Sequence, residues 1–187
     1  MSNRLQLKPA KTEVLWCSST RRQHQIPTGL VRVGDTSVQP VRTVRDLGIY
    51  TDADVTMIAH VTAVVKACFA ALSQIRSVRR SLTLVHALVV TKVNYCCSGL
   101  SGIFGQLIQR LQFVFNAAAR LVFYARKSEH ITPLLRELHW LKVPERIQFQ
   151  SCVLAYRCLI GTAPSYLAEI FTGYLPGAAA PGIDVPS

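Results

Sequence analysis

The spacing of apolar residues changes near residue 56, and this change limits the fold more than any other feature. Before it, apolar and polar residues alternate in short runs separated by Gly, Pro and polar residues, a pattern typical of strands and turns. After it, apolar residues recur at intervals of three and four, which predicts amphipathic helices. The first helical run contains Ile58, Val61, Val64, Val65, Cys68, Leu72 and Ile75. The sequence therefore predicts an α+β chain.

Strand signals fill the predicted β-rich part, residues 1–55. Residues 30–38 (LVRVGDTSV) read as a hairpin, because Gly34-Asp35 can adopt the positive φ angles of a tight turn. Residues 44–50 are predicted as one further strand, with Gly48 at a point of close backbone approach. Residues 18–28, which include Arg21 and Arg22, are polar and are predicted as a loop.

Helix signals fill the second part, residues 56–171. Two further helices are predicted at residues 84–97 and 106–124. Thr132-Pro133 and Pro144-Glu145 resemble helix starts, since Pro is favoured at the first helical position. Gly161 is a natural helix stop. Residues 172–187 are mostly Gly, Ala and Pro with almost no charge, so we expect a disordered tail there.

Charge and composition narrow the classes of function. The formal net charge is +11 and 50% of residues are hydrophobic, which excludes global disorder and favours binding to polyanions. An alternative is a basic part of a longer protein whose acidic regions lie elsewhere. The most apolar stretch, residues 82–104, contains His86, Lys92 and Asn94, so we expect a packed helix rather than a membrane span.

The six cysteines do not form a metal-binding pattern. They show no Cys-x-x-Cys pair and no His at zinc-finger spacing. Cys68, Cys152 and Cys158 lie in apolar helical contexts, where a free Cys usually behaves as a small core residue. We therefore predict reduced thiols, an intracellular location and no bound metal.

Six short segments occur in a specific order along the chain. They are residues 3–13 (NRLQLKPAKTE), 44–50 (VRDLGIY), 116–122 (NAAARLV), 130–135 (HITPLL), 138–147 (LHWLKVPERI) and 161–167 (GTAPSYL). In this order and spacing they resemble the reverse transcriptase of LINE-type (non-LTR, jockey-like) retrotransposons, in the portion that follows its catalytic hairpin. The resemblance covers roughly residues 1–170. It implies the end of a polymerase palm, with short antiparallel strands, followed by a thumb and connection region.

The resemblance also implies that the catalytic centre is absent from this chain. The family's Asp-Asp pair lies just before the segment that matches residues 3–13, and no Asp or Glu precedes Glu13. A two-metal polymerase holds its cations with paired carboxylates, so Mg²⁺ is implied only for the full-length family enzyme. Asp52 and Asp54 are the one close acidic pair, and we assign them to a turn and a helix N-cap.

Two groups of residues are predicted to contact nucleic acid. Leu47, Gly48, Ile49 and Tyr50 match the family's primer grip, where a Gly allows backbone amides to approach a sugar-phosphate chain. An ordinary half-buried strand is the alternative. Basic side chains that a thumb would place on a duplex backbone form the second group, with a solvated helix face as their alternative. They are Lys66, Arg76, Arg79, Arg80, Arg120, Arg126 and Lys127.

The chain departs from the family at one point. The family carries about two more helical turns, on the order of seven residues, between the positions of Thr83 and Leu84. We hypothesise a degenerate copy of the element: a truncated reverse-transcriptase fragment without polymerase activity, separated from the rest of the polymerase, with residual non-specific binding to RNA or DNA duplexes. A non-catalytic basic helical interaction module is the alternative, and a metal-dependent enzyme built on Asp52 and Asp54 is a third.

Overall fold

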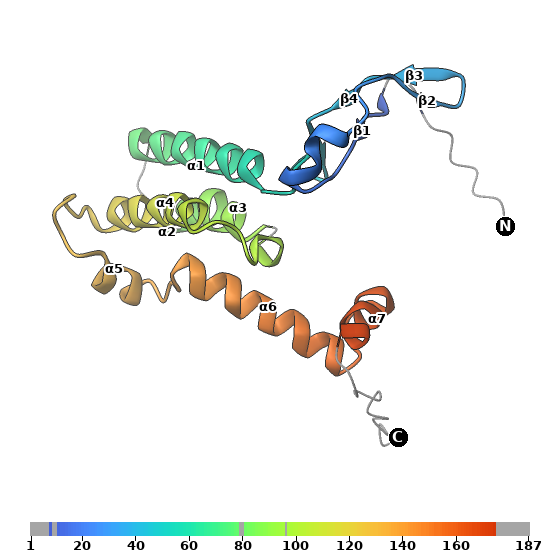
Figure 1. Cartoon of the computed structure of the whole chain (residues 1–187). Helices are drawn as coiled ribbons and strands as arrows, with labels where there is room; N and C mark the ends of the chain where they lie inside the picture. The colour runs from blue at the N-terminus through green and yellow to red at the C-terminus, as the bar shows by residue number, and fades with distance from the viewer. Residues whose placement is uncertain (1–7, 9–10, 79–80, 96, 175–187) are drawn as a thin grey trace.

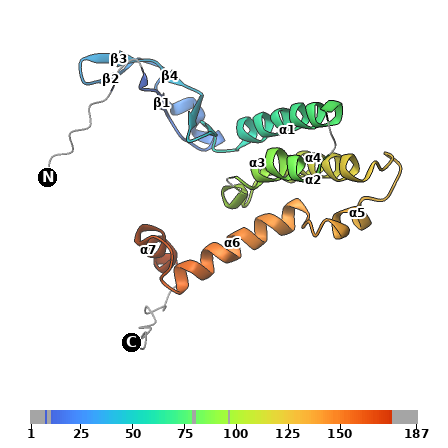
Figure 2. The ribbon, with the colours of Figure 1, turned by 180° about the vertical axis from the view of Figure 1, so that it is seen from behind.

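The computed structural model describes residues 8, 11–78, 81–95 and 97–174, without the side chains of 20, 23 and 170–174. Short strands occupy one end of the molecule and helices occupy the rest (Figure 1). The same order is visible from behind (Figure 2), where the second half of α6 diverges from the other helices and leads to α7. The predicted α+β class is confirmed.

The strands form three separate two-stranded sheets. β1 pairs with β4 in parallel, whereas β2–β3 and β5–β6 are antiparallel, so the prediction of an entirely antiparallel β part is wrong for one pair. A 3₁₀ helix, η2 (Thr20–Gln25), occupies most of the predicted loop. The strands are β1 (Val14–Leu15), β2 (Val31–Val33), β3 (Thr36–Val38), β4 (Pro40–Val41), β5 (Thr43–Asp46) and β6 (Ile49–Asp52).

The hairpin predicted at residues 30–38 is confirmed. Val33 pairs with Thr36 across a two-residue turn, and Gly34 has φ +61°. Glycine reaches this left-handed region without the steric cost that a Cβ imposes. Local turn chemistry was therefore sufficient to define this hairpin.

The single strand predicted at residues 44–50 is wrong, because this segment is a second hairpin. β5 and β6 pair antiparallel, with Asp46 opposite Ile49. Leu47 and Gly48 form the turn, with φ +46° and +85°, the positive pair that a type I′ turn requires. Leucine is rarely found in this conformation, and this explains why Leu47-Gly48 was not recognised as a turn.

The helices begin close to the predicted change in apolar spacing. They are α1 (Ile58–Val78), α2 (Leu82–Val85), the π-helical turn η3 (His86–Val90), α3 (Thr91–Asn94), the 3₁₀ helix η4 (Cys97–Leu100), α4 (Gly105–Phe123), α5 (Ile131–Glu137), α6 (Val143–Leu159) and α7 (Ser165–Tyr174). α4 agrees with its predicted range within a residue at each end. α7 ends at Tyr174, inside the range predicted as a tail, while residues 175–187 lie outside the described part.

Helix starts were predicted less well than helix interiors. α5 begins at Ile131 with His130 as its N-cap, so the assignment of Thr132 as N-cap is wrong. α6 begins at Val143, and the Glu145 carboxylate accepts a hydrogen bond from the Lys142 backbone N–H at 3.0 Å. Gly161 follows the end of α6 with φ +69°, as predicted.

In the described chain the buried residues of the apolar core lie in the helical part, and the half-buried Ile49 of β6 packs against them. α1 packs along α4. Five residues of the predicted stripe are buried (Val61, Val64, Cys68, Leu72 and Ile75), whereas Ile58 is 48% exposed, so the prediction is wrong for that residue. Phe115 of α4 is fully buried, and Trp140 meets its ring edge-on at 5.5 Å, an arrangement that aromatic pairs favour. In the described chain before Met57 no residue is buried. The β part therefore has no core of its own.

The segment between residues 82 and 94 is a continuous helical run with a π turn at its centre. The Thr91 backbone N–H donates to the His86 carbonyl, five residues earlier. Val85, Val89 and Val93 are buried, so this segment packs against the core. Of the described helices, α1 is long and apolar enough to cross a membrane. One such helix is weak support for a span, because a core helix passes the same test.

Cys68, Cys152 and Cys158 were predicted as core residues. Cys68 and Cys158 are buried, whereas Cys152 is exposed, which contradicts the prediction for that residue. Cys97, for which no core role was predicted, is also buried. Burial raises the pKa of the Cys68 thiol to about 11, although the Lys92 ammonium partly opposes this shift. Cys68 is therefore a protonated, unreactive side chain at neutral pH.

We expect amide hydrogens in β2–β6 to exchange faster than those of α1 and α4 by roughly two orders of magnitude or more, because strands without buried side chains open at low free-energy cost. Hydrogen–deuterium exchange read by mass spectrometry measures this difference. Equal protection in residues 31–52 and residues 61–75 would contradict it.

Candidate nucleic-acid interface

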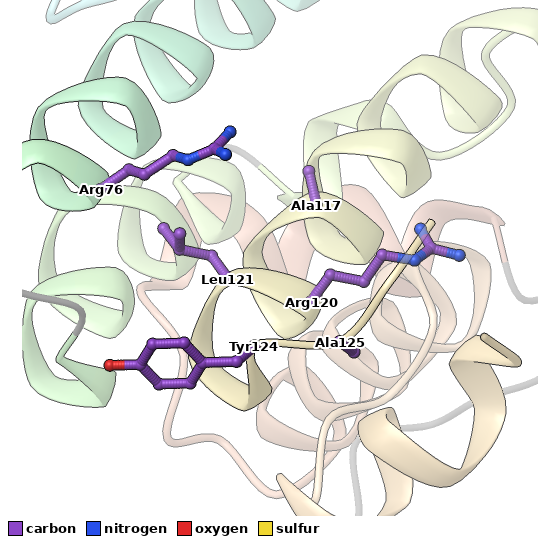
Figure 3. Close-up of a pocket in the computed structure, with 6 residues that line it drawn as sticks. All are labelled: Arg76, Ala117, Arg120, Leu121, Tyr124 and Ala125. Atoms are coloured by element: carbon purple, nitrogen blue, oxygen red, sulfur yellow. The ribbon is translucent and has the colours of Figure 1, made fainter. Parts of the chain in front are cut away.

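A basic cavity opens where α1 and α4 end side by side. It has a volume of about 280 Å³ and is lined by Arg76 from α1 and by Ala117, Arg120, Leu121, Tyr124 and Ala125 from α4 and the residues after it. Figure 3 shows Arg76 reaching from α1 toward α4, while Arg120 and Tyr124 leave α4 in opposite directions. The fold thus brings together two arginines that were predicted as members of separate clusters.

Helix ends position both arginines. Arg76 lies in the last turn of α1 and Arg120 in the last turn of α4. Tyr124 ends α4 in the left-handed conformation, with φ +56°, and its N–H donates to the Arg120 carbonyl. Cations stabilise the negative end of the helix dipole, so this placement has a structural benefit that needs no ligand.

The hydrogen bonds of Arg120 indicate a second role, in binding an anion. Its side chain is half-buried, and Nη2 donates to the Glu129 carbonyl at 3.4 Å. Its Nε is buried and has no acceptor. No carboxylate lines this cavity in the described chain. A guanidinium with unmet hydrogen-bonding capacity favours an oxyanion as its partner.

The other predicted basic residues lie outside this cavity. Arg126 and Lys127 are exposed in the turn after α4, and the Arg126 backbone N–H donates to the Glu129 carboxylate at 2.5 Å, which places an acid beside them. Lys66 is exposed on α1, about 15 Å along the axis from Arg76 and about 80° around it. Arg79 and Arg80 lie outside the described residues.

The residues predicted as a primer grip form the tip and second strand of the β5–β6 hairpin. The Tyr95 hydroxyl donates to the Leu47 carbonyl at 2.6 Å, which anchors the tip on the helical part. A Cβ on Gly48 would meet only the Tyr95 ring at 3.8 Å, an ordinary contact. Gly48 is thus required for its positive φ and not, as predicted, for close backbone approach.

Sequence reasoning missed a second cavity, of about 500 Å³, beneath this hairpin. Its polar lining comes from Arg45, Tyr50, His60, Lys92 and Tyr95. The Tyr50 backbone N–H donates to His60 Nδ1 at 3.4 Å, while His60 Nε2 is buried without a partner. Burial lowers the pKa of His60, so the imidazole is neutral at pH 7. The available signal was the set of polar residues that interrupts the apolar stretch around residue 92.

The two aspartates predicted as turn and cap residues have different surroundings. The Asp52 carboxylate accepts from the Thr56 N–H at 2.6 Å, the Thr56 hydroxyl at 2.8 Å and the Met57 N–H at 3.2 Å. It therefore caps the start of α1, as predicted, while Asp54 is exposed. In the described chain no group of three His, Cys, Asp or Glu side chains could hold a metal ion.

No family model, curated protein or solved structure matches this chain.

Asp52→Ala should lower the free energy of unfolding by about 1–2 kcal/mol, the usual cost of losing a helix cap. Asp54→Ala, the matched control, should change it by less than about 0.5 kcal/mol. Urea unfolding followed by circular dichroism measures both values, and an equal loss in the two variants would contradict the capping role.

This stabilisation should also depend on pH. Partial burial raises the pKa of Asp52, but the hydrogen bonds from Thr56, Ala59 and Met57 outweigh it, so the folded-state pKa lies below 3.8. The contribution is therefore fully present above pH 3.8 and is lost as the pH falls through the lower folded-state pKa. Wild type and Asp52→Ala should converge in stability in acid.

Proposed function

We propose that this chain is a reverse-transcriptase-like segment of the kind that follows a catalytic hairpin, and that it binds nucleic-acid duplexes through their phosphates without sequence preference. The observation that carries the proposal is the basic cavity between α1 and α4. Arg76 and Arg120 come from distant parts of the sequence and line one cavity without a carboxylate in the described chain. Duplex phosphates provide oxyanions at regular spacing, and contacts to them carry no sequence information.

The position of the β5–β6 hairpin supports the same proposal. Leu47 at its tip is 82% exposed, so this residue is accessible to a nucleic-acid strand, although its carbonyl is held by the Tyr95 hydroxyl. Arg45, whose guanidinium lies 5.5 Å from the Tyr50 ring centroid, adds a cation beside the turn. The resemblance assigns a primer grip to this segment, and an exposed tip with one arginine beside it can contact a sugar-phosphate chain.

The residues present do not fit the Mg²⁺ that the family enzyme uses. The hydrogen bonds at the start of α1 engage both oxygens of Asp52. Asp54 is exposed, and among the described residues it belongs to no group of three side chains that could hold a metal ion. We therefore assign this chain duplex binding and no catalytic step.

A second candidate, a non-catalytic basic helical interaction module, has one observation in its favour. The buried core runs from Met57 to Cys158 and includes no residue of the described β part. The helical part thus has the contacts to fold without the strands. On this alternative the basic cavity binds an acidic protein surface rather than a duplex.

The chain should not extend a primer. With primer–template, nucleotides and Mg²⁺, the purified protein should give no incorporation above background, because a two-metal mechanism needs paired carboxylates free to bind cations. A gel-based extension assay reads this directly. Template-dependent incorporation that disappears in Asp52→Asn or Asp54→Asn would refute the proposal in favour of a metal-dependent enzyme.

Duplex binding should weaken as salt rises, with a slope of log K against log salt of about −0.9 for each phosphate contacted. The double variant Arg76→Ala/Arg120→Ala should flatten this slope by about two units and weaken all sequences alike. Fluorescence anisotropy with two unrelated duplexes and a salt series measures both effects.

The matched control for this experiment is Arg21→Ala/Arg22→Ala, which removes the same charge from the exposed helix η2. It should change the slope less than the cavity variant does. Salt-independent binding, or a larger effect of the control pair, would contradict the proposed interface. Tighter binding to an acidic peptide than to either duplex would favour the interaction module.

A further inference from the structure

A third cavity lies between the π turn η3 and the connection from α5 to α6. Its volume is about 560 Å³, within the range of about 300–1,000 Å³ typical of sites for small organic ligands. His86, Val90, Leu138, His139, Trp140 and Arg146 are among its lining residues. This lining shares no residue with the basic cavity of α1 and α4, and the described residues that line it include no carboxylate.

Arg146 is the principal charged group in this cavity. Its Nη1 donates to Asn94 Oδ1 at 3.0 Å, and its guanidinium carbon lies 4.9 Å from the centroid of the Phe115 ring. Its Nε is buried without an acceptor. Burial lowers its pKa, but an arginine keeps its proton in proteins. Amide and ring contacts therefore hold this cation in place without neutralising its charge.

The contacts of Arg146 leave its Nη2 nitrogen open to a ligand. Nη1 is engaged by Asn94, and Nε has no contact with solvent. Nη2 donates to no described residue and is not among the buried atoms without a partner, so we take it as the donor that a ligand can reach. An oxyanion at Nη2 would supply the charge-assisted hydrogen bond that the folded chain does not provide.

Backbone conformation provides an independent observation at His139. The Trp140 N–H donates to the Leu135 carbonyl at 2.8 Å, and the His139 N–H donates to the Arg136 carbonyl at 3.0 Å. These two bonds form a Schellman motif with His139, at φ +53°, in the position that glycine usually occupies. The left-handed conformation is costly for a side-chain-bearing residue. An unfavourable conformation that keeps an imidazole at a cavity is typical of a functional position.

The opposite wall carries a second irregularity. η3 is a π turn, closed by the bond from the Thr91 N–H to the His86 carbonyl. Single π turns within α-helices occur frequently at functional sites. His86, at the start of this turn, is exposed and lines the cavity. The two irregular backbone segments thus place two imidazoles beside Trp140 and Arg146.

We propose that this cavity binds a phosphorylated compound with a planar ring, of the size of a nucleoside monophosphate. The phosphate binds Nη2 of Arg146, because this is the open donor of a cation without a carboxylate partner. The ring lies against Trp140, whose indole is only half-buried despite its contact with Phe115, and base–aromatic stacking contributes to the affinity. This site is separate from the proposed duplex interface.

Adenosine monophosphate tests the proposal, with orthophosphate and adenosine as the two partial ligands. Isothermal titration calorimetry on the full chain should show binding of the nucleotide. Orthophosphate and adenosine should each bind at least about tenfold more weakly, since each lacks one of the two contacts. Orthophosphate binding as tight as nucleotide binding, or no nucleotide binding at millimolar concentration, would refute the proposal.

Three variants locate the site. Arg146→Met should weaken nucleotide binding at least about tenfold, the effect expected for a lost charge-assisted hydrogen bond. His139→Gly should weaken nucleotide binding severalfold, because it removes the imidazole that lines the cavity beside Trp140. It should keep or raise Tm, because glycine adopts the left-handed conformation without strain. Arg157→Met, which removes an exposed arginine from the same helix, should leave the affinity unchanged.

The outcomes separate this site from the duplex interface. Arg76→Ala/Arg120→Ala should leave nucleotide affinity unchanged within about twofold, and His139→Gly should leave duplex affinity unchanged. If Arg146→Met fails to fold, His139→Gly alone decides the result. Unaltered nucleotide affinity in His139→Gly, or its loss in Arg76→Ala/Arg120→Ala, would overturn the inference.

Discussion

The packing of α1 against α4 is the contact on which the rest of the structure depends. Val61, Cys68 and Ile75 on α1 are buried in one stripe, and Ala118 on α4 is fully buried. A small residue there lets the two helices approach closely, and close-packed interiors do not tolerate added volume well. Because the helices end at the same edge, this packing also fixes the distance between Arg76 and Arg120. The proposed duplex interface is thus a consequence of how the core is filled.

Phe115 connects this packing to the remainder of the helical part. Trp140 contacts the Phe115 ring edge-on, and the Arg146 guanidinium lies 4.9 Å from the centroid of the same ring. A charged group over an aromatic ring gains electrostatic stabilisation without being neutralised. The same buried side chain therefore supports the α5–α6 connection and keeps a cation available to the third cavity. The contacts that stabilise the core are therefore also those on which the proposed ligand site depends.

The junction between the strands and the helices combines the packing of Ile49 against the helical core with a few polar contacts. Asp52 caps α1, the Tyr50 N–H donates to His60, and Tyr95 holds the hairpin tip. Only the first was predictable, because an acidic residue before an apolar helix is a local cap signal. The β5–β6 turn was not, because Leu47 has no intrinsic preference for positive φ and adopts it in a hairpin anchored on the helical part.

The sequence by itself determined the elements whose signals are local. Apolar spacing located α1 and α4, Gly34 with Asp35 marked the β2–β3 turn, and Gly161 marked the end of α6, since each depends on backbone preferences over a few residues. Only the tertiary structure decided which charged groups meet. Arg146 bonds to Asn94 across 52 positions, and Arg76 shares a cavity with Arg120. Such contacts follow from how helices pack, and the periodicity of a single helix does not specify its partner's register.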